Sequence, residues 1–247
     1  MKAAPFLFAA LALFAWEATV RILHTPSYIL PGPLDIATAF WSAPTLLLGS
    51  LASTLLVTAT ALATSTLLGV ALALLTALSP GARAAILPWA IVLQVTPIVA
   101  IAPLIIVWIG DPFTALVVCA TIVAFFPVFS NTAAGLAAVP PELLDLFRLN
   151  HATRWQTLRL LRIPAAVPQF LAGLRISGGL ALVGAVVAEF VAGSGGVASG
   201  LAFRILEAGY RLQIPRMFAA LALLSAAGLA INAALGTLQH WLLRRME

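Results

Sequence analysis

The stretch PFTALVVCATIVAFFPVFSNTAAGLAAVPP, Pro112 to Pro141, decides the fold because it is long, apolar and free of charge. The segment that overlaps its end, PPELLDLFRLNHATRWQTLRLLRIP at Pro140 to Pro164, carries six Asp, Glu and Arg residues. A transmembrane helix needs about 20 predominantly apolar residues. The first stretch therefore predicts a helix that crosses a membrane, and the second predicts a polar loop outside it.

The composition of the whole chain is also typical of a membrane protein. Apolar residues make up 62% of the 247 residues, and charged residues only 9%. A soluble domain carries nearer a quarter charged residues, whereas a bilayer favours apolar side chains and satisfies no backbone hydrogen bonds. We therefore expect an all-α membrane protein, with residues 1–247 in one transmembrane domain.

Runs without charge, or with one isolated charge, recur along the chain and predict six transmembrane helices. The expected spans are residues 4–22, 46–78, 85–109, 114–138, 165–192 and 215–242. Glu17 and Arg21 lie one helical turn apart, and an ion pair between them would let the first span include both. Pro44 separates the second span from a short interfacial helix expected at residues 33–43.

Two features leave alternatives open. The charge-free run from Ile36 to Ala82 is long enough for two spans, which would give seven helices. The first segment, KAAPFLFAALALFA, also resembles a signal peptide. However, no small-x-small cleavage motif ends cleanly before Trp16, so an uncleaved membrane anchor is favoured.

The arginines predict the orientation, because short cytoplasmic loops of membrane proteins are enriched in Lys and Arg. With the amino terminus inside, the cytoplasmic segments contain Lys2, Arg83, Arg148, Arg154, Arg159, Arg162, Arg244 and Arg245. The opposite side, with loops 23–45 and 193–214, carries Arg204, Arg211 and Arg216, and Arg21 lies near that boundary. Both termini and the loop 140–164 are expected in the cytoplasm and Gly195 outside. The basic composition then needs no nucleic-acid partner.

The sequence lacks the usual patterns of catalytic and metal-binding residues. Lys2 is the only lysine, so the chain contains no phosphate-binding loop of the G-x-x-x-x-G-K-[ST] type. The run Gly193–Ala198 matches a dinucleotide fingerprint, but it follows a membrane helix instead of a β-strand and is interpreted as an outer loop. Cys119 is interpreted as a small buried residue. We expect no catalytic residue, metal site or cofactor in this chain.

The charged loop is expected to begin with a short helix. Pro141 suits the first helical position, and Glu142 and Asp145 lie near the positive end of the helix dipole. Arg148 comes later, where a cation is favourable. This helix is about ten residues long, too short to span a membrane.

A second helix should follow a tight turn. Thr153 and Gln156 match the capping box, in which two side chains satisfy each other's backbone N–H groups. This helix is expected to run from Thr153 to about Arg162, and Pro164 to open the next span. On physical grounds alone, the loop could also be an amphipathic hairpin that rests on lipid headgroups.

Four stretches together resemble a known family. The longest, ELLDLFRLNHATRWQTLRLLRIPAAVPQFLAGLRISGGLALVGAVVAEF, is similar to the Glu-Ala-Ala loop region of ABC importer permeases, in particular the branch that serves nitrate, alkanesulfonates, taurine and thiamine precursors. The others are SYILPGP at Ser27–Pro33, TPIVAIAPLIIVWIG at Thr96–Gly110 and FFPVFSNTAAGL at Phe125–Leu136. They occur in the family's order and span most of the chain.

The resemblance implies a fold, a function and partners. The fold is a six-helix type I ABC importer transmembrane domain with a cytoplasmic coupling helix. The chain would be a permease in the bacterial inner membrane that forms the pathway for a small solute. Its partners would be two ATPases, which bind ATP and Mg, a second permease, identical or homologous, and an external solute-binding protein. A stand-alone secondary carrier or channel is the alternative.

The resemblance also assigns roles within the loop. Polar contacts with the ATPase would come from Glu142, Asp145, Arg148 and Arg154, and apolar contacts from Leu146, Phe147 and Trp155. The family's Glu-Ala-Ala reads Asp145-Leu146-Phe147 here, which would require a different groove. The family's turn glycine falls on His151, which tolerates a left-handed conformation only at a cost. Either the turn is altered or a neighbour holds His151 in place.

Polar groups within the spans are the candidates for the translocation pathway. They are Gln94, Thr96, Ser130, Asn131, Arg175 and Glu189. Ionisable residues inside a membrane are costly and mark functional sites. Arg175 could instead anchor at the inner interface and Glu189 cap an outer contact. Pro97, Pro103 and Pro127 are expected to kink the helices. No arginine cluster lines the pathway, so solute selection should rest with the binding protein.

Overall fold

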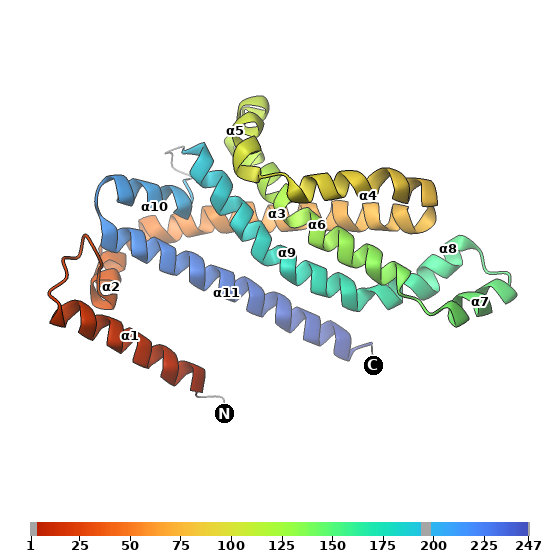
Figure 1. Ribbon diagram of the computed structural model, residues 1–247, viewed down its shortest axis with the longest axis horizontal. Helices are drawn as coiled ribbons and strands as arrows, with labels where there is room; N and C mark the ends of the chain where they lie inside the picture. Colours follow the sequence, from red (N-terminus) through yellow and green to blue (C-terminus); the bar gives the residue numbers. More distant parts are fainter. Residues whose placement is uncertain (1–3, 194–198, 247) are drawn as a thin grey trace. The chain divides into compact units, whose positions relative to one another are not determined.

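The computed structural model describes residues 4–193 and 199–246, and within them the chain is helical, with no β-strand (Figure 1). The expected outer position Gly195 lies outside these residues. The helices are α1 (Ala4–Ile22), α2 (Pro33–Ser42), α3 (Pro44–Leu78), α4 (Pro80–Val95), α5 (Ile98–Ile109), α6 (Pro112–Ala137), α7 (Pro141–Leu149), α8 (Arg154–Thr157), a π-helical turn (Leu158–Arg162), α9 (Ile163–Ala192), α10 (Leu201–Tyr210) and α11 (Ile214–Arg244).

Most of the expected spans are present as long apolar helices. Four helices are long and apolar enough to cross a membrane: α3, α6, the continuous helix Arg154–Ala192, and α11. The bent pair α4 and α5 would add a fifth span. Helix α1 covers the first expected span, with Arg21 bonded to Glu17 as expected, but it is not among these candidates. The count of six therefore stays a prediction.

The expected span at residues 85–109 is present as two helices that meet at a sharp bend. Helix α4 ends at Val95 and α5 begins at Ile98, and the two helices form an angle of 103°. Pro97 lacks an N–H and disfavours a helical conformation of the residue before it. Thr96 is accordingly extended, with φ −73° and ψ 123°, and its hydroxyl donates to the Val92 carbonyl at 2.6 Å.

The second loop helix and the fifth expected span, expected as two separate helices, form one continuous helix. The helix that begins at Arg154 continues to Ala192, through the π-helical turn Leu158–Arg162. A proline inside an α-helix removes one backbone hydrogen bond and crowds the preceding turn. Pro164 lies two residues after the π-helical turn, whose wider backbone accommodates the ring without ending the helix.

The chain divides into two compact units. The first combines Met1–Thr54 with Gly193–Ala227, and the second combines Leu55–Ala192 with Gly228–Glu247. In the first unit, the Leu201 N–H donates to the Thr54 hydroxyl at 2.9 Å, and Arg204 Nε donates to the Ser50 hydroxyl at 3.1 Å. These bonds hold α10 against the first part of α3.

Helices α6 and α9 form the centre of the second unit and pack through small residues (Figure 1). A Cβ atom at Gly173 would lie 2.6 Å from the Pro127 carbonyl oxygen, and one at Gly184 would lie 2.8 Å from Ala120 Cα. Membrane helices approach closely where such residues leave room. Ser177 adds a hydrogen bond of 2.7 Å to the Ala124 carbonyl, and Cys119 is buried nearby, as expected.

Candidate coupling loop and translocation residues

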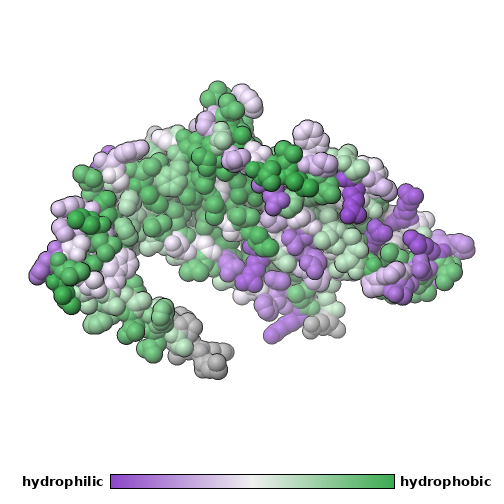
Figure 2. Space-filling model, viewed as in Figure 1, coloured by the Kyte–Doolittle hydropathy of each residue, from purple (hydrophilic) through white to green (hydrophobic). Residues whose placement is uncertain are grey.

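The first short helix of the charged loop is α7, and none of its residues is buried. Asp145 and Arg148 form an ion pair at 2.9 Å on its exposed face. Figure 2 shows hydrophilic side chains gathered over the α7–α8 end of the second unit. An exposed ion pair of this kind adds at most about 0.5 kcal/mol to the stability of the helix. Since no residue of α7 is buried either, packing within the chain does not explain this helix.

The turn after α7 retains the left-handed conformation for which the family uses glycine. His151 has φ 52°, and its N–H donates to the Arg148 carbonyl at 3.0 Å. The Ala152 N–H reaches the Phe147 carbonyl, also at 3.0 Å. These two bonds form the Schellman motif that ends many helices. His151 therefore occupies the left-handed position of the turn, and these backbone hydrogen bonds stabilise its unfavourable conformation.

The second short helix begins with the expected capping box. The Thr153 N–H donates to Gln156 Oε1 at 2.8 Å, and the Gln156 N–H donates to Thr153 Oγ1 at 3.2 Å. Both ends of the turn are thus fixed by local hydrogen bonds. The prediction from the Thr153-x-x-Gln156 spacing is confirmed.

The loop also presents large apolar side chains to its surroundings. Leu146 is 52% exposed, Leu149 78% and Trp155 62%, whereas Phe147 is half-buried. The expected polar contact residues Glu142, Asp145, Arg148 and Arg154 are all exposed, as is the turn residue His151. Exposed apolar side chains rimmed by polar ones are typical of protein contact surfaces. Sequence reasoning missed Leu149, although it lies three residues after Leu146 on the same helical face.

A cavity of about 490 Å³ separates the loop from the turn between α3 and α4. Its lining residues are Ala77, Leu78, Pro80, Leu144, Arg148, Ala152, Arg154, Thr157, Leu158 and Arg162. Arg162 crosses to the other side, where its Nη1 donates to the Ala77 carbonyl at 3.3 Å. This contact links the π-helical turn to the end of α3, and no local sequence pattern could have indicated it.

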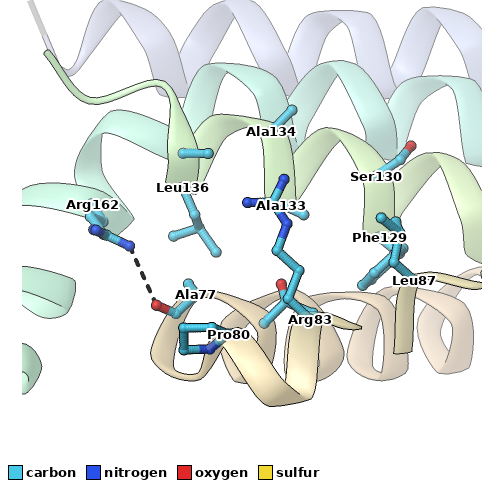
Figure 3. A pocket seen from close by; sticks show the side chains of 12 residues that line it. Ala77, Pro80, Arg83, Leu87, Phe129, Ser130, Ala133, Ala134, Leu136 and Arg162 are labelled. Atoms are coloured by element: carbon cyan, nitrogen blue, oxygen red, sulfur yellow. Dashed lines mark hydrogen bonds between the residues drawn. The ribbon is translucent and has the colours of Figure 1, made fainter. Parts of the chain in front are cut away.

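The candidate pathway residues near α4 and α6 lie in two different cavities. Gln94 and Thr96 line a cavity of about 260 Å³ that also contacts Phe126, and Pro97 lies at the break between α4 and α5. Ser130 lines a second cavity, of about 440 Å³, toward α3 (Figure 3). The position of Pro97 at a bend agrees with its expected role as a kink.

The other candidates are engaged in contacts or buried. The Asn131 amide nitrogen donates to the Pro127 carbonyl at 2.9 Å, one turn earlier in α6. Arg175 is exposed, and its Nε donates to Asn232 Oδ1 of α11 at 2.9 Å. Glu189 is buried in α9, with 4% of its surface exposed. Arg175 and Glu189 therefore occupy contrasting surroundings on one helix.

Comparison with known proteins identifies the family. Residues 65–247 match the protein family described as "Binding-protein-dependent transport system inner membrane component". The chain belongs to this family. It is a multi-pass membrane protein and a permease component of an ABC transporter.

Three curated relatives match the permease over nearly its whole length. A probable ABC transporter permease protein of Haemophilus influenzae is 32% identical and covers 96% of this chain and 95% of its own. The riboflavin transport system permease protein RibX of Chloroflexus aurantiacus is 37% identical, and the match covers 95% of this chain and 87% of RibX. The formylaminopyrimidine transport permease protein ThiX of Halalkalibacterium halodurans is 31% identical, and the match covers 97% of this chain and 94% of ThiX.

A solved structure supports the fold of the permease. The chain of an amino acid ABC transporter crystallised with histidines superposes with a TM-score of 0.67 at 22% identity. The match covers 82% of this permease and 97% of that chain. The permease therefore has the fold of an ABC transporter transmembrane domain.

Proposed function

We propose that this permease imports a small solute across the bacterial inner membrane as one of two identical or homologous permeases. Two ATPases would bind ATP and Mg in the cytoplasm, and a solute-binding protein would deliver the solute from outside. The observation that carries the proposal is α7, a helix with no buried residue that presents Leu146 and Leu149 to the surroundings. Family membership supports the same reading.

The loop would couple ATPase movement to the membrane bundle through a continuous helix. From Arg154 to Ala192, α8, the π-helical turn and α9 form one helix, which a Schellman turn joins to α7. Helix α9 packs closely on α6, so a displacement of α7 would move both helices. ATP binding could then shift the balance between inward-open and outward-open states, as any ligand with different affinities for the two does.

The orientation follows from the same assignment. The loop 140–164 and both termini would face the cytoplasm, because the ATPases act there and the arginines favour that side. The chain itself would hydrolyse no ATP, since its only lysine, Lys2, lies far from any glycine-rich loop.

Planar nitrogen heterocycles are the solutes to test first. Two relatives that match nearly the whole chain are named for riboflavin and formylaminopyrimidine transport. The cavity of about 260 Å³ beside the bend combines the Gln94 amide and the Thr96 hydroxyl with the Phe126 ring. An amide can bond ring nitrogens and carbonyls while an aromatic side chain stacks on the ring. Selection would still rest mainly with the binding protein.

The test is uptake into proteoliposomes. The permease should be inactive alone and should accumulate solute only with its ATPase, its binding protein and ATP. Labelled riboflavin and formylaminopyrimidine are the first substrates, with taurine as the contrasting anion. Uptake by the permease alone would overturn the proposal in favour of a secondary carrier or channel.

A further inference from the structure

The cavity of about 440 Å³ between the α3–α4 turn and α6 has a basic lining that the transport function leaves unexplained. Arg83 of α4 and Arg162 of the π-helical turn both line it, together with Ser130 of α6 and Pro80, the first residue of α4. Figure 3 shows the Arg83 side chain rising from α4 toward Ala133 and Ala134, and Arg162 reaching Ala77 at the other end. Two cationic side chains therefore border one hollow.

No carboxylate balances these charges within the lining. Among the described residues, Arg83 forms no ion pair or side-chain hydrogen bond, and Arg162 makes only its bond of 3.3 Å to the Ala77 carbonyl. A guanidinium carries five N–H donors, so most donors of both groups are available. The adjoining cavity adds Arg148 and Arg154, of which only Arg148 has a carboxylate partner.

The remaining lining also suits an anion. Pro80 begins α4, so the positive end of that helix dipole lies at the cavity. Ser130 can donate its hydroxyl proton. Arginine forks match the geometry of phosphate oxygens, and two of them can bind different oxygens of one group. A phosphate group fits these donors.

The surroundings favour a lipid as the source of this phosphate. Leu87 lines the cavity and is 39% exposed, and Trp89 on the same helix is 71% exposed. Tryptophan favours the membrane interface, and basic pockets between helices on the cytoplasmic side bind lipid headgroups. We propose that Arg83 and Arg162 hold the phosphate of an anionic phospholipid of the cytoplasmic leaflet, with its acyl chains along the exposed face of α4. The choice of leaflet rests on the orientation proposed above.

The test measures lipid retention by the purified permease in native mass spectrometry. The delipidated protein in detergent is titrated with phosphatidylglycerol or phosphatidylcholine, and separately with inorganic phosphate. Arg83→Gln is the main variant because it removes no internal hydrogen bond, whereas Arg162→Gln also removes the bond to Ala77. Arg159→Gln is the matched control, since Arg159 lies on the same π-helical turn but lines neither cavity.

The wild type should bind phosphatidylglycerol more tightly than phosphatidylcholine. Arg83→Gln should weaken phosphatidylglycerol binding about fivefold, as expected for one interfacial arginine, and Arg159→Gln should leave it unchanged. Equal losses in both variants would overturn the proposal, because they would indicate attraction by net charge. Displacement of the lipid by inorganic phosphate at similar concentration would overturn the lipid assignment. The assay needs neither ATPase nor transport, so its outcome is independent of the transport proposal.

Discussion

The α6–α9 contact and the α7–α8 segment lie next to each other in the second unit but are stabilised in opposite ways. Between α6 and α9, glycine positions such as Gly173 and Gly184 leave no room for even a Cβ atom. In α7 no residue is buried, and its polar contacts are local: the Asp145–Arg148 pair and the turn at His151. The first region is packed within the chain, and the second is left exposed.

This difference predicts where substitutions should act. A change at the α6–α9 contact should affect folding of the permease wherever it is measured. A change on the surface of α7 should leave folding intact and appear only when the ATPase is present.

The largest effect on folding is expected for Gly173→Ala in α9. The new Cβ would lie 2.6 Å from the Pro127 carbonyl oxygen and 2.8 Å from Asn131 Cβ, and backbone atoms cannot move aside cheaply. Overpacking of this kind costs about 1–3 kcal/mol. The melting temperature in detergent should fall. Gly179→Ala is the control, because a Cβ there meets nothing within 4 Å, and its melting temperature should not fall. Equal melting temperatures for the two variants would contradict close packing of α6 on α9.

Charge reversal at Asp145 should act on the ATPase instead. Loss of a desolvated charge contact costs about 2–5 kcal/mol of binding, and loss of a rim contact about 1 kcal/mol or less. We expect Asp145→Arg to weaken co-purification of the ATPase without lowering the melting temperature of the permease. The double variant Asp145→Arg with Arg148→Asp restores an ion pair within α7 but reverses its polarity, so it should also bind weakly.

A control for Asp145 must leave local structure intact. Asp35 in α2 accepts the Gly32 N–H at 3.1 Å, so Asp35→Arg would disturb the start of that helix. Asp35→Asn changes the charge and retains an acceptor oxygen, and it should leave ATPase binding unchanged. Normal ATPase binding by the double variant would mean that α7 docks through Leu146 and Leu149 rather than through its charges.

The sequence predicted the helices well where a local rule determines them. Long charge-free runs indicated the apolar helices, and Pro44 indeed separates α2 from α3. The capping box at Thr153 is present in full. Residues 154–192 were predicted as two helices, one that ends at about Arg162 and one that Pro164 opens, because the π-helical turn between them leaves no known sequence pattern. Pro97 was expected to kink its helix, but its 103° angle was not predicted, since a proline signals a break but not its size.

The candidate sites were predictable only in part, for a related reason. Helical spacing and capping rules located the exposed face of α7. The bond from Arg162 to Ala77 joins residues 85 positions apart, and only the packing of α3 and α6 creates the cavity beside it. The sequence does carry a pattern that indicates the close contacts of Gly173 and Gly184. Small residues recur along one face of α9 at 173, 177, 181, 184 and 188.

A smaller effect is expected for His151→Gly in the turn after α7. A left-handed conformation costs a non-glycine residue about 1 kcal/mol or more, so glycine should stabilise the turn locally. Amide hydrogen exchange at residues 150–153 should slow, while the melting temperature of the permease stays the same. Leu212→Gly is the matched control, because Leu212 has φ 55° in the same motif after α10. Slower exchange near residue 151 in the Leu212 variant would show that the effect is not local.

The smallest effect is a pH dependence at Asp111, which precedes α6 and caps its first turn. Its carboxylate accepts hydrogen bonds from the Thr114 hydroxyl and from the Thr114 N–H at 2.8 Å, and these hold the pKa of Asp111 below its ordinary value of 3.8. Since the folded-state pKa is the lower one, this stabilisation is present above the unfolded-state pKa and is lost as the pH falls through the folded-state pKa.

The exchange protection of the Thr114 amide, corrected for intrinsic rates, should therefore be constant above about pH 5 and fall below roughly pH 4. Asp111→Asn keeps an acceptor oxygen but does not titrate, so its protection should be independent of pH. Because the bonds are local, amides at the α6–α9 contact should keep their protection throughout. A simultaneous loss there would mean that acid disrupts the α6–α9 contact itself and not only the cap of α6.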